Sequence, residues 1–195
     1  MMDKIISNYI KYKFIFNKDI NHSSYLYQKV FRSLYGYQQN VTKKNKKVYT
    51  YTRKGLLSDI PHLKPGKNSF IIPLNYENLI INYFKTGENP AHLWKNKGDW
   101  KVEYIIEKLE VDLESVIECL ENFLSNYNII NLDNKSSLLL TELDYIIRTN
   151  NNNKDYIKYI LKECNKITNF NWFKEVYKKS DLLSSFYEKY NSLVN

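Results

Sequence analysis

The residues of this chain that come closest to a catalytic arrangement are Asp59 and His62, three positions apart in the segment DIPH. A carboxylate near an imidazole can act as an acid/base pair in proton transfer. A turn residue followed by an exposed imidazole accounts for the same two residues without catalysis. The sequence therefore favours a protein without evident catalysis and leaves any catalytic residues unassigned.

Recognisable metal and cofactor motifs are not found in the sequence. The histidines His22, His62 and His92 are far apart, and Cys119 and Cys164 form no C-x-x-C pair. Both cysteines fit apolar helix faces, where cysteine acts as a small core residue. The glycines are separated by at least ten residues, so the glycine-rich loops that bind phosphates are excluded. We therefore expect no metal and no cofactor.

The positive charge is concentrated at one end of the chain. Residues 1–70 contain 14 Lys+Arg and 3 Asp+Glu, whereas residues 71–195 contain 15 and 18. Abundant lysine and tyrosine can result from A+T-rich codons, but codon bias acts along the whole chain and does not explain this asymmetry. A strongly basic end indicates a nucleic-acid or anionic surface. The alternative is a solvated basic face without a partner.

Cations and aromatic side chains alternate within this basic end. Phosphates are neutralised by cations, and bases are contacted by aromatic rings or by a helix. The expected nucleic-acid-binding residues lie on one face of a helix, in a lysine run, along a strand and in the turn after it: Tyr25, Gln28, Lys29, Arg32, Lys43, Lys44, Lys46, Lys47, Tyr49, Tyr51, Arg53, Lys54, Lys64 and Lys67. The alternatives are a solvated helix face, a mobile lysine loop, and tyrosines that pack against a neighbouring helix.

All glycines and prolines lie between Gly36 and Gly98, which predicts helices on both sides and turns with strands between them. Hydrophobic spacing predicts helices over 3–16, 23–35, 75–85, 101–109, 112–127, 137–148, 154–167, 170–178 and 181–194. Alternation predicts strands over 47–53 and 69–73, joined through the turn at Pro65-Gly66. Asn21 or Ser23 is expected to cap the second helix, and Asp99 the helix over 101–109.

These elements predict a mainly α protein with a small β-hairpin. Residues 1–98 form a winged-helix-like nucleic-acid-binding region, and residues 99–195 form a helical packing or partner-binding region. The fit to a winged helix is imperfect because two helices, rather than three, clearly precede the expected hairpin. The linker between its strands is also longer than a tight hairpin needs.

The sequence favours a DNA- or RNA-binding protein. The alternatives are an adaptor or small subunit that docks on an acidic partner, and a nucleic-acid-processing enzyme with an unrecognised site. The C-terminal helices could contact a protein partner. No apolar run approaches the roughly 18 residues of a membrane span, and the N-terminus is charged throughout. We therefore expect an intracellular protein that does not bind membranes.

Overall fold

The computed structural model describes residues 3–17, 20–42, 46–89, 95–133, 135–149 and 151–194, with the side chain of Tyr51 left out. The chain divides into two compact units: residues 8–108, here the N-terminal unit, and residues 1–7 with 109–195, here the C-terminal unit. About 50% of the chain is helical and 27% is strand, in three antiparallel sheets. The prediction of a mainly α protein with one hairpin is therefore wrong, and the chain is an α+β protein.

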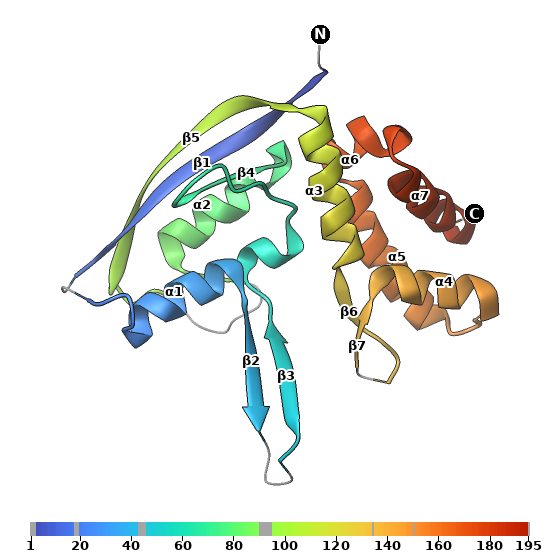
Figure 1. Cartoon of the computed structure of the whole chain (residues 1–195), viewed down its shortest axis with the longest axis horizontal. Helices are drawn as coiled ribbons and strands as arrows, with labels where there is room; N and C mark the ends of the chain where they lie inside the picture. The colour runs from blue at the N-terminus through green and yellow to red at the C-terminus, as the bar shows by residue number, and fades with distance from the viewer. Residues whose placement is uncertain are drawn as a thin grey trace. The chain divides into compact units, whose positions relative to one another are not determined.

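Two long strands replace two of the predicted helices (Figure 1). β1 (Lys4–Phe16) occupies the predicted helix over 3–16, and β5 (Trp100–Asp112) occupies the one over 101–109. Side chains of β1 alternate between buried Ile10 and Tyr12 and exposed lysines. Alternation with a period of two specifies a strand. The helical interpretation failed because it relied on the absence of glycine and proline from these segments. A long strand can lack both residues just as a helix can. Asp99 accordingly caps no helix.

The largest sheet has the strand order β4-β1-β5. β4 (Ser69–Ile72) pairs antiparallel with β1, from Asn8 opposite Ile72 to Lys11 opposite Ser69. At one end of the β1–β5 pair, Asn17 N donates to Asp99 O at 3.2 Å; at the other end, Leu113 N donates to Asp3 O at 3.1 Å. The chain passes between the two units within β1, after residue 7, and within β5, after residue 108.

Helices α1 (Tyr25–Tyr35) and α2 (Glu77–Thr86) provide the apolar side chains that pack against this sheet in the N-terminal unit. Both agree with predicted helices, although Ser24 caps α1 in place of Asn21 or Ser23. The 3-10 helices η1 (Leu56–Asp59) and η2 (Leu74–Tyr76) complete this part of the fold. The buried core of the unit comprises Ile10, Tyr12, Val30, Leu34, Leu56, Leu57, Ile60, Phe70, Ile72, Ile80, Tyr83, Phe84 and Trp100.

The hairpin of the N-terminal unit differs from the predicted one. β3 (Val48–Arg53) pairs with β2 (Tyr37–Thr42), which the sequence did not predict, whereas β4 pairs with β1. β2 was missed because its centre, Gln38–Asn40, is polar and lacks apolar alternation. The winged-helix-like arrangement is therefore wrong: the predicted strands are both present, but they belong to different sheets.

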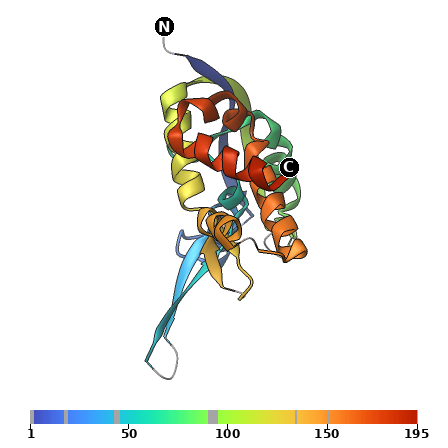
Figure 2. The same ribbon diagram turned by 90° about the vertical axis from the view of Figure 1, so that its right-hand side faces the viewer.

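The C-terminal unit is built mainly from helices, and Figure 2 turns it toward the viewer. Its elements are α3 (Leu113–Ser125), β6 (Asn128–Ile130), β7 (Ser136–Leu138), α4 (Leu139–Thr149), α5 (Lys154–Thr168), α6 (Asn171–Val176), η3 (Tyr177–Lys179) and α7 (Asp181–Val194). Leu120 is fully buried and Leu113 is half-buried. Among the described residues, no helix has both the length and the apolar character that crossing a membrane requires.

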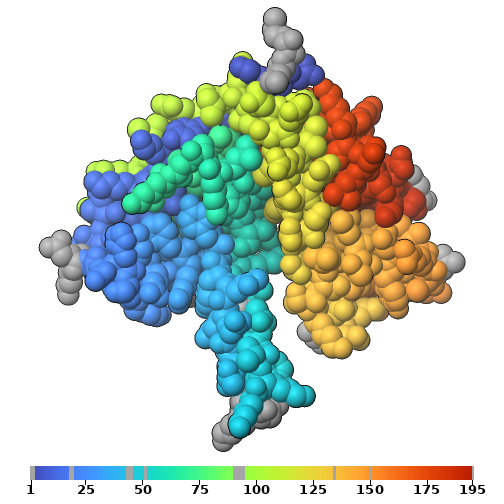
Figure 3. Space-filling view, viewed as in Figure 1, coloured from blue at the N-terminus to red at the C-terminus, as the bar shows by residue number. Residues whose placement is uncertain are grey.

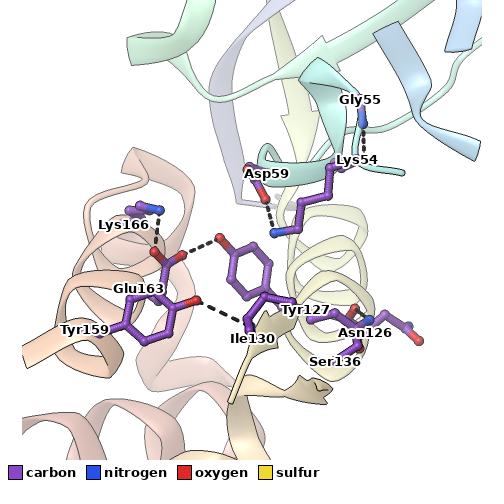
Figure 4. A network of polar contacts seen from close by, with 12 residues as sticks. Lys54, Gly55, Asp59, Asn126, Tyr127, Ile130, Ser136, Tyr159, Glu163 and Lys166 are labelled. Carbon is purple, nitrogen blue, oxygen red and sulfur yellow. Dashed lines mark hydrogen bonds and ion pairs between the residues drawn. The ribbon is translucent and has the colours of Figure 1, made fainter. Parts of the chain in front are cut away.

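Buried polar contacts stabilise the C-terminal unit, and one of them involves Ser7 at the start of β1. Trp172 Nε1 donates to Ser7 Oγ at 2.9 Å, and both side chains are buried. The buried carboxylate of Glu163 accepts a hydrogen bond from Tyr127 at 3.0 Å and pairs with Lys166 at 2.6 Å (Figure 4). Burial raises the pKa of the neighbouring Cys164 thiol to about 12. That thiol is therefore protonated and acts as a core residue, as predicted.

Candidate nucleic-acid interface

The basic residues are concentrated on α1 and the β2–β3 hairpin. Residues 20–58 contain eight Lys+Arg and no Asp or Glu, and Asp19 and Asp59 mark the ends of this acid-free segment. Because carboxylates repel phosphates and neutralise neighbouring cations, a segment without its own acidic residues concentrates positive charge that can attract an anionic partner. The segment is also continuous in the fold, since a single residue, Gly36, separates α1 from β2.

The exposed face of α1 holds the predicted helical residues together. Tyr25 is 77% exposed, and Lys29 Nζ lies 5.7 Å from the centre of its ring. Gln28 and Lys29 are half-buried, and the amide of Gln28 donates to the carbonyl of Ser23 at 3.2 Å. Arg32 is exposed in the last turn. The opposite face carries Val30 and Leu34 into the core, so the helix is anchored by one side and presents the other to solvent.

The β2–β3 hairpin projects from the N-terminal unit as an arm (Figures 1 and 3). Its pairing runs from Tyr37 opposite Arg53 to Thr42 opposite Val48. Among the described residues of the two strands, each side chain is exposed or half-buried and none joins the core of the unit. An arm of two strands without a buried face is available for contact along its whole length.

The two faces of the hairpin differ in character. Directly paired residues point to the same face of an antiparallel sheet. One face carries the cross-strand partners Tyr37 and Arg53, and the partners Val41 and Tyr49. The other face is polar apart from the exposed Val48, and Thr50 Oγ1 there donates to Asn40 Oδ1 at 2.8 Å. The tyrosine and arginine that the sequence assigned to the interface are thus on one side.

The lysine run connects the two strands of the hairpin in the sequence. The loop between the strands spans residues 43–47, of which four are lysines. Lys46 and Lys47 are exposed, and Lys46 has a positive φ of 60°. Lys43 and Lys44 lie outside the described residues, as does the side chain of Tyr51. The pairing nevertheless puts the ends of the loop at Thr42 and Val48, at the far end of the arm.

Two glycines form the base of the arm. Gly36 has a φ of 76°, and a Cβ atom there would lie 2.6 Å from Arg53 O. A Cβ atom on Gly55 would lie 2.1 Å from Gly36 N. Only glycine allows backbones to approach this closely. Arg32 adds a side-chain contact, because its guanidinium lies 4.8 Å from the centre of the Tyr37 ring. The base of the arm is therefore a tight junction with the end of α1.

Three predicted residues lie away from the exposed face of the arm. Lys54 forms an ion pair with Asp59 at 2.8 Å (Figure 4), which reduces the charge available to phosphate. Lys64 Nζ lies 4.7 Å from the centre of the Tyr35 ring, near the end of α1. Lys67 belongs to the turn before β4, away from the hairpin pairing.

The possible acid/base pair is not assembled. Asp59 is engaged by Lys54, whereas His62 Nδ1 lies 2.9 Å from the carbonyl oxygen of Ile60. Burial lowers the pKa of His62, and nearby Lys64 lowers it further, while the Ile60 carbonyl opposes the shift. The imidazole is therefore held neutral and hydrogen-bonded to the backbone carbonyl of Ile60. This arrangement serves the local structure and not proton transfer with Asp59.

Sequence reasoning missed one residue of the candidate interface, Tyr37, together with the strand that carries it. Its signal was weak: a glycine at 36 followed by a tyrosine and polar residues. Among the residues that the structure describes, no group of three or more His, Cys, Asp or Glu side chains could hold a metal ion. His92 lies outside the described residues.

Comparison with protein-family models, with curated protein sequences and with solved structures finds no match for this chain.

Proposed function

We propose that this chain binds nucleic acid through the exposed face of α1 and the β2–β3 hairpin. One observation carries the proposal: seven of the eight cations of the acid-free segment belong to α1, to the β2 and β3 strands or to the loop that joins these strands. The lysines at the tip of the arm neutralise phosphates, and the release of condensed counterions supplies the free energy of binding.

A two-stranded arm is a type of element that enters a groove of duplex nucleic acid. The major groove of B-DNA admits an α-helix or a two-stranded β-ribbon. Arg53 and Tyr49 lie on one face of the ribbon, where a guanidinium can bond a guanine or a phosphate with two hydrogen bonds. A tyrosine ring can stack on an unpaired base. In this arrangement the lysines between the strands contact the phosphate backbone of the nucleic acid, while the face with Arg53 and Tyr49 approaches the bases.

The deciding experiment is a titration of labelled duplex and single-stranded DNA and RNA with the full chain at several salt concentrations. For duplex DNA, each phosphate contact contributes about 0.9 to the slope of log K against log salt. The Lys46→Ala/Lys47→Ala variant is expected to bind more weakly and to reduce this slope by up to about 1.8. Replacing Lys43 and Lys44 as well should reduce it by up to about 3.6.

A matched control removes the same charge elsewhere. Lys154→Ala/Lys158→Ala changes two exposed lysines of α5, in the other unit, and should leave the affinity and the salt slope close to those of the parent. Equal effects of the two double variants would show that binding follows net charge and not the arm. Failure of the parent chain to bind any of the four nucleic acids at low salt would overturn the proposal.

A further inference from the structure

The C-terminal unit contains a cleft that the hairpin proposal does not use. Helices α5, α6 and α7 and the 3-10 helix η3 line a cavity of about 320 Å³. Small-molecule sites commonly occupy about 300–1,000 Å³, so this cavity has room for one small ligand. All the residues that line it belong to the same unit.

One wall of the cleft is aromatic. The buried ring of Phe173 is parallel to the ring of Tyr177, with centres 5.6 Å apart. The centre of the Tyr187 ring lies 4.6 Å from that of Tyr177, and the centre of the Tyr190 ring lies 6.4 Å from that of Tyr187. The three tyrosines are half-buried, so each is held by its neighbours and still reaches the cavity. Such a wall favours a flat ligand.

The polar groups of the cleft are asparagine amides. Asn165 and Asn169 come from the end of α5, and Asn191 comes from α7. Each amide offers two donor hydrogens and an acceptor oxygen, the pattern that also recognises the edge of a nucleobase. Tyr190 OH donates to Asn165 Oδ1 at 3.3 Å, and this contact fixes the orientation of one amide.

The charge at the cleft is positive. Lys174 lines it, and Lys178 Nζ lies 5.8 Å from the centre of the Tyr177 ring. None of the lining residues, all of which are described, is an aspartate or glutamate. A ligand that carries a negative charge beside a flat ring is therefore favoured over a neutral one, and over a neutral proline-rich peptide.

From this combination we infer that the cleft binds a nucleoside phosphate. The base lies against the tyrosine wall with its edge toward the asparagine amides, and the phosphate lies near Lys174 and Lys178. The same chemistry is present in a free nucleotide and in an unpaired nucleotide of a single strand. The inference depends on no residue of the hairpin and holds or fails independently of the proposed function.

The test uses the full chain and calorimetric titration with the four ribonucleoside monophosphates, the four corresponding nucleosides, which include adenosine, and ribose 5-phosphate. At least one monophosphate should bind more tightly than its two fragments. A stacked aromatic ring contributes about a 5- to 150-fold change in affinity. Tyr187→Leu should weaken binding within that range, while Tyr187→Phe, which keeps the ring, should retain it. Tyr145→Leu changes an exposed tyrosine of α4 and serves as the matched control.

The outcomes separate the sources of the ligand. Tighter binding of a single-stranded trinucleotide than of any monophosphate would identify the ligand as part of a nucleic-acid strand. Tighter binding of a monophosphate would identify the ligand as a free nucleotide. Lys174→Gln should weaken the monophosphate more than the corresponding nucleoside, and Lys46→Ala/Lys47→Ala should change neither. Ribose 5-phosphate binding as tightly as every monophosphate would overturn the inference. So would equal losses in Tyr187→Leu and Tyr145→Leu, or no binding by any of these ligands.

Discussion

The guanidinium of Arg32 lies 4.8 Å from the centre of the Tyr37 ring, and this contact joins the last turn of α1 to the first residue of β2. The two residues are separated by a short stretch that includes Gly36, where the backbone turns with a φ of 76°. Since the arm has no buried face, its direction depends on this junction. The side-chain contact and the glycine can be tested separately.

Removing the side-chain contact should loosen the arm without unfolding the unit. A cation over an aromatic ring at an exposed site contributes about 0.5–1 kcal/mol. We expect Arg32→Gln to speed hydrogen exchange of the β2–β3 amides about two- to fivefold. Exchange in α2, whose Ile80 and Tyr83 are core residues, should be unchanged. An equal increase in both elements would show that Arg32 stabilises the whole unit and not the arm.

Replacing Gly36 should lower the free energy of unfolding more than replacing Arg32 does. An alanine at position 36 meets both a positive φ and a Cβ atom 2.6 Å from Arg53 O. Gly98 provides the control, because its φ is 87° but a Cβ atom there meets nothing within 4 Å among the described atoms. Left-handed backbone costs about 1–2 kcal/mol for a residue with a Cβ atom. In urea denaturation, Gly98→Ala should lose about that much and Gly36→Ala clearly more. Equal losses would show that the junction relaxes to accept the methyl group.

The sequence predicted the helices with buried stripes better than the strands. The stripe that contains Val30 and Leu34 correctly indicates α1, and the one that contains Val116 and Leu120 correctly indicates α3. β1 and β5 were read as helices because some of their apolar residues also repeat at helical spacing. Their alternation, with Ile10 and Tyr12 buried beside exposed lysines, was the better signal.

The sequence located the basic segment but did not predict how its strands pair. Strand partners are decided by contacts between distant residues, and β3 could pair with either neighbour on propensity alone. It pairs with the polar β2, which has no core-facing pattern to predict it. The cleft in the C-terminal unit was also missed, because Asn165, Tyr177 and Tyr190 meet only when three helices pack together.

Leu120 tests the core of the C-terminal unit. It is fully buried on α3, whereas Leu113, on the same helix, is half-buried. Truncating a buried leucine to alanine costs about 2–5 kcal/mol, depending on how far the surrounding atoms relax. We expect Leu120→Ala to lose stability in that range in urea denaturation and Leu113→Ala to lose less. An unchanged midpoint for Leu120→Ala would mean that this face of α3 is open to solvent.

The buried carboxylate of Glu142 makes the stability of the C-terminal unit sensitive to acid. Burial alone would raise the pKa of Glu142, but hydrogen bonds from Ser137, Tyr156 and Asn131 outweigh burial and lower it. The bond from Tyr156 OH to Glu142 Oε2 is 2.6 Å long. A carboxyl group whose pKa is lower in the folded state stabilises the fold above its unfolded pKa, near 4.3. This contribution is lost as the pH falls through the folded pKa.

Glu142→Gln should therefore be less stable than the parent at pH 7, because a neutral amide accepts these hydrogen bonds more weakly than a carboxylate. The difference in unfolding free energy should shrink steadily as the pH falls below about 4.3. Urea denaturation at pH 7, 5, 4 and 3 measures it, with Glu188→Gln, an exposed position on α7, as the control. Tyr156→Phe removes the donor and should likewise weaken the dependence on pH. A difference between Glu142→Gln and the parent that stays constant from pH 7 to pH 3 would show that the side chain acts through packing and not through its charge.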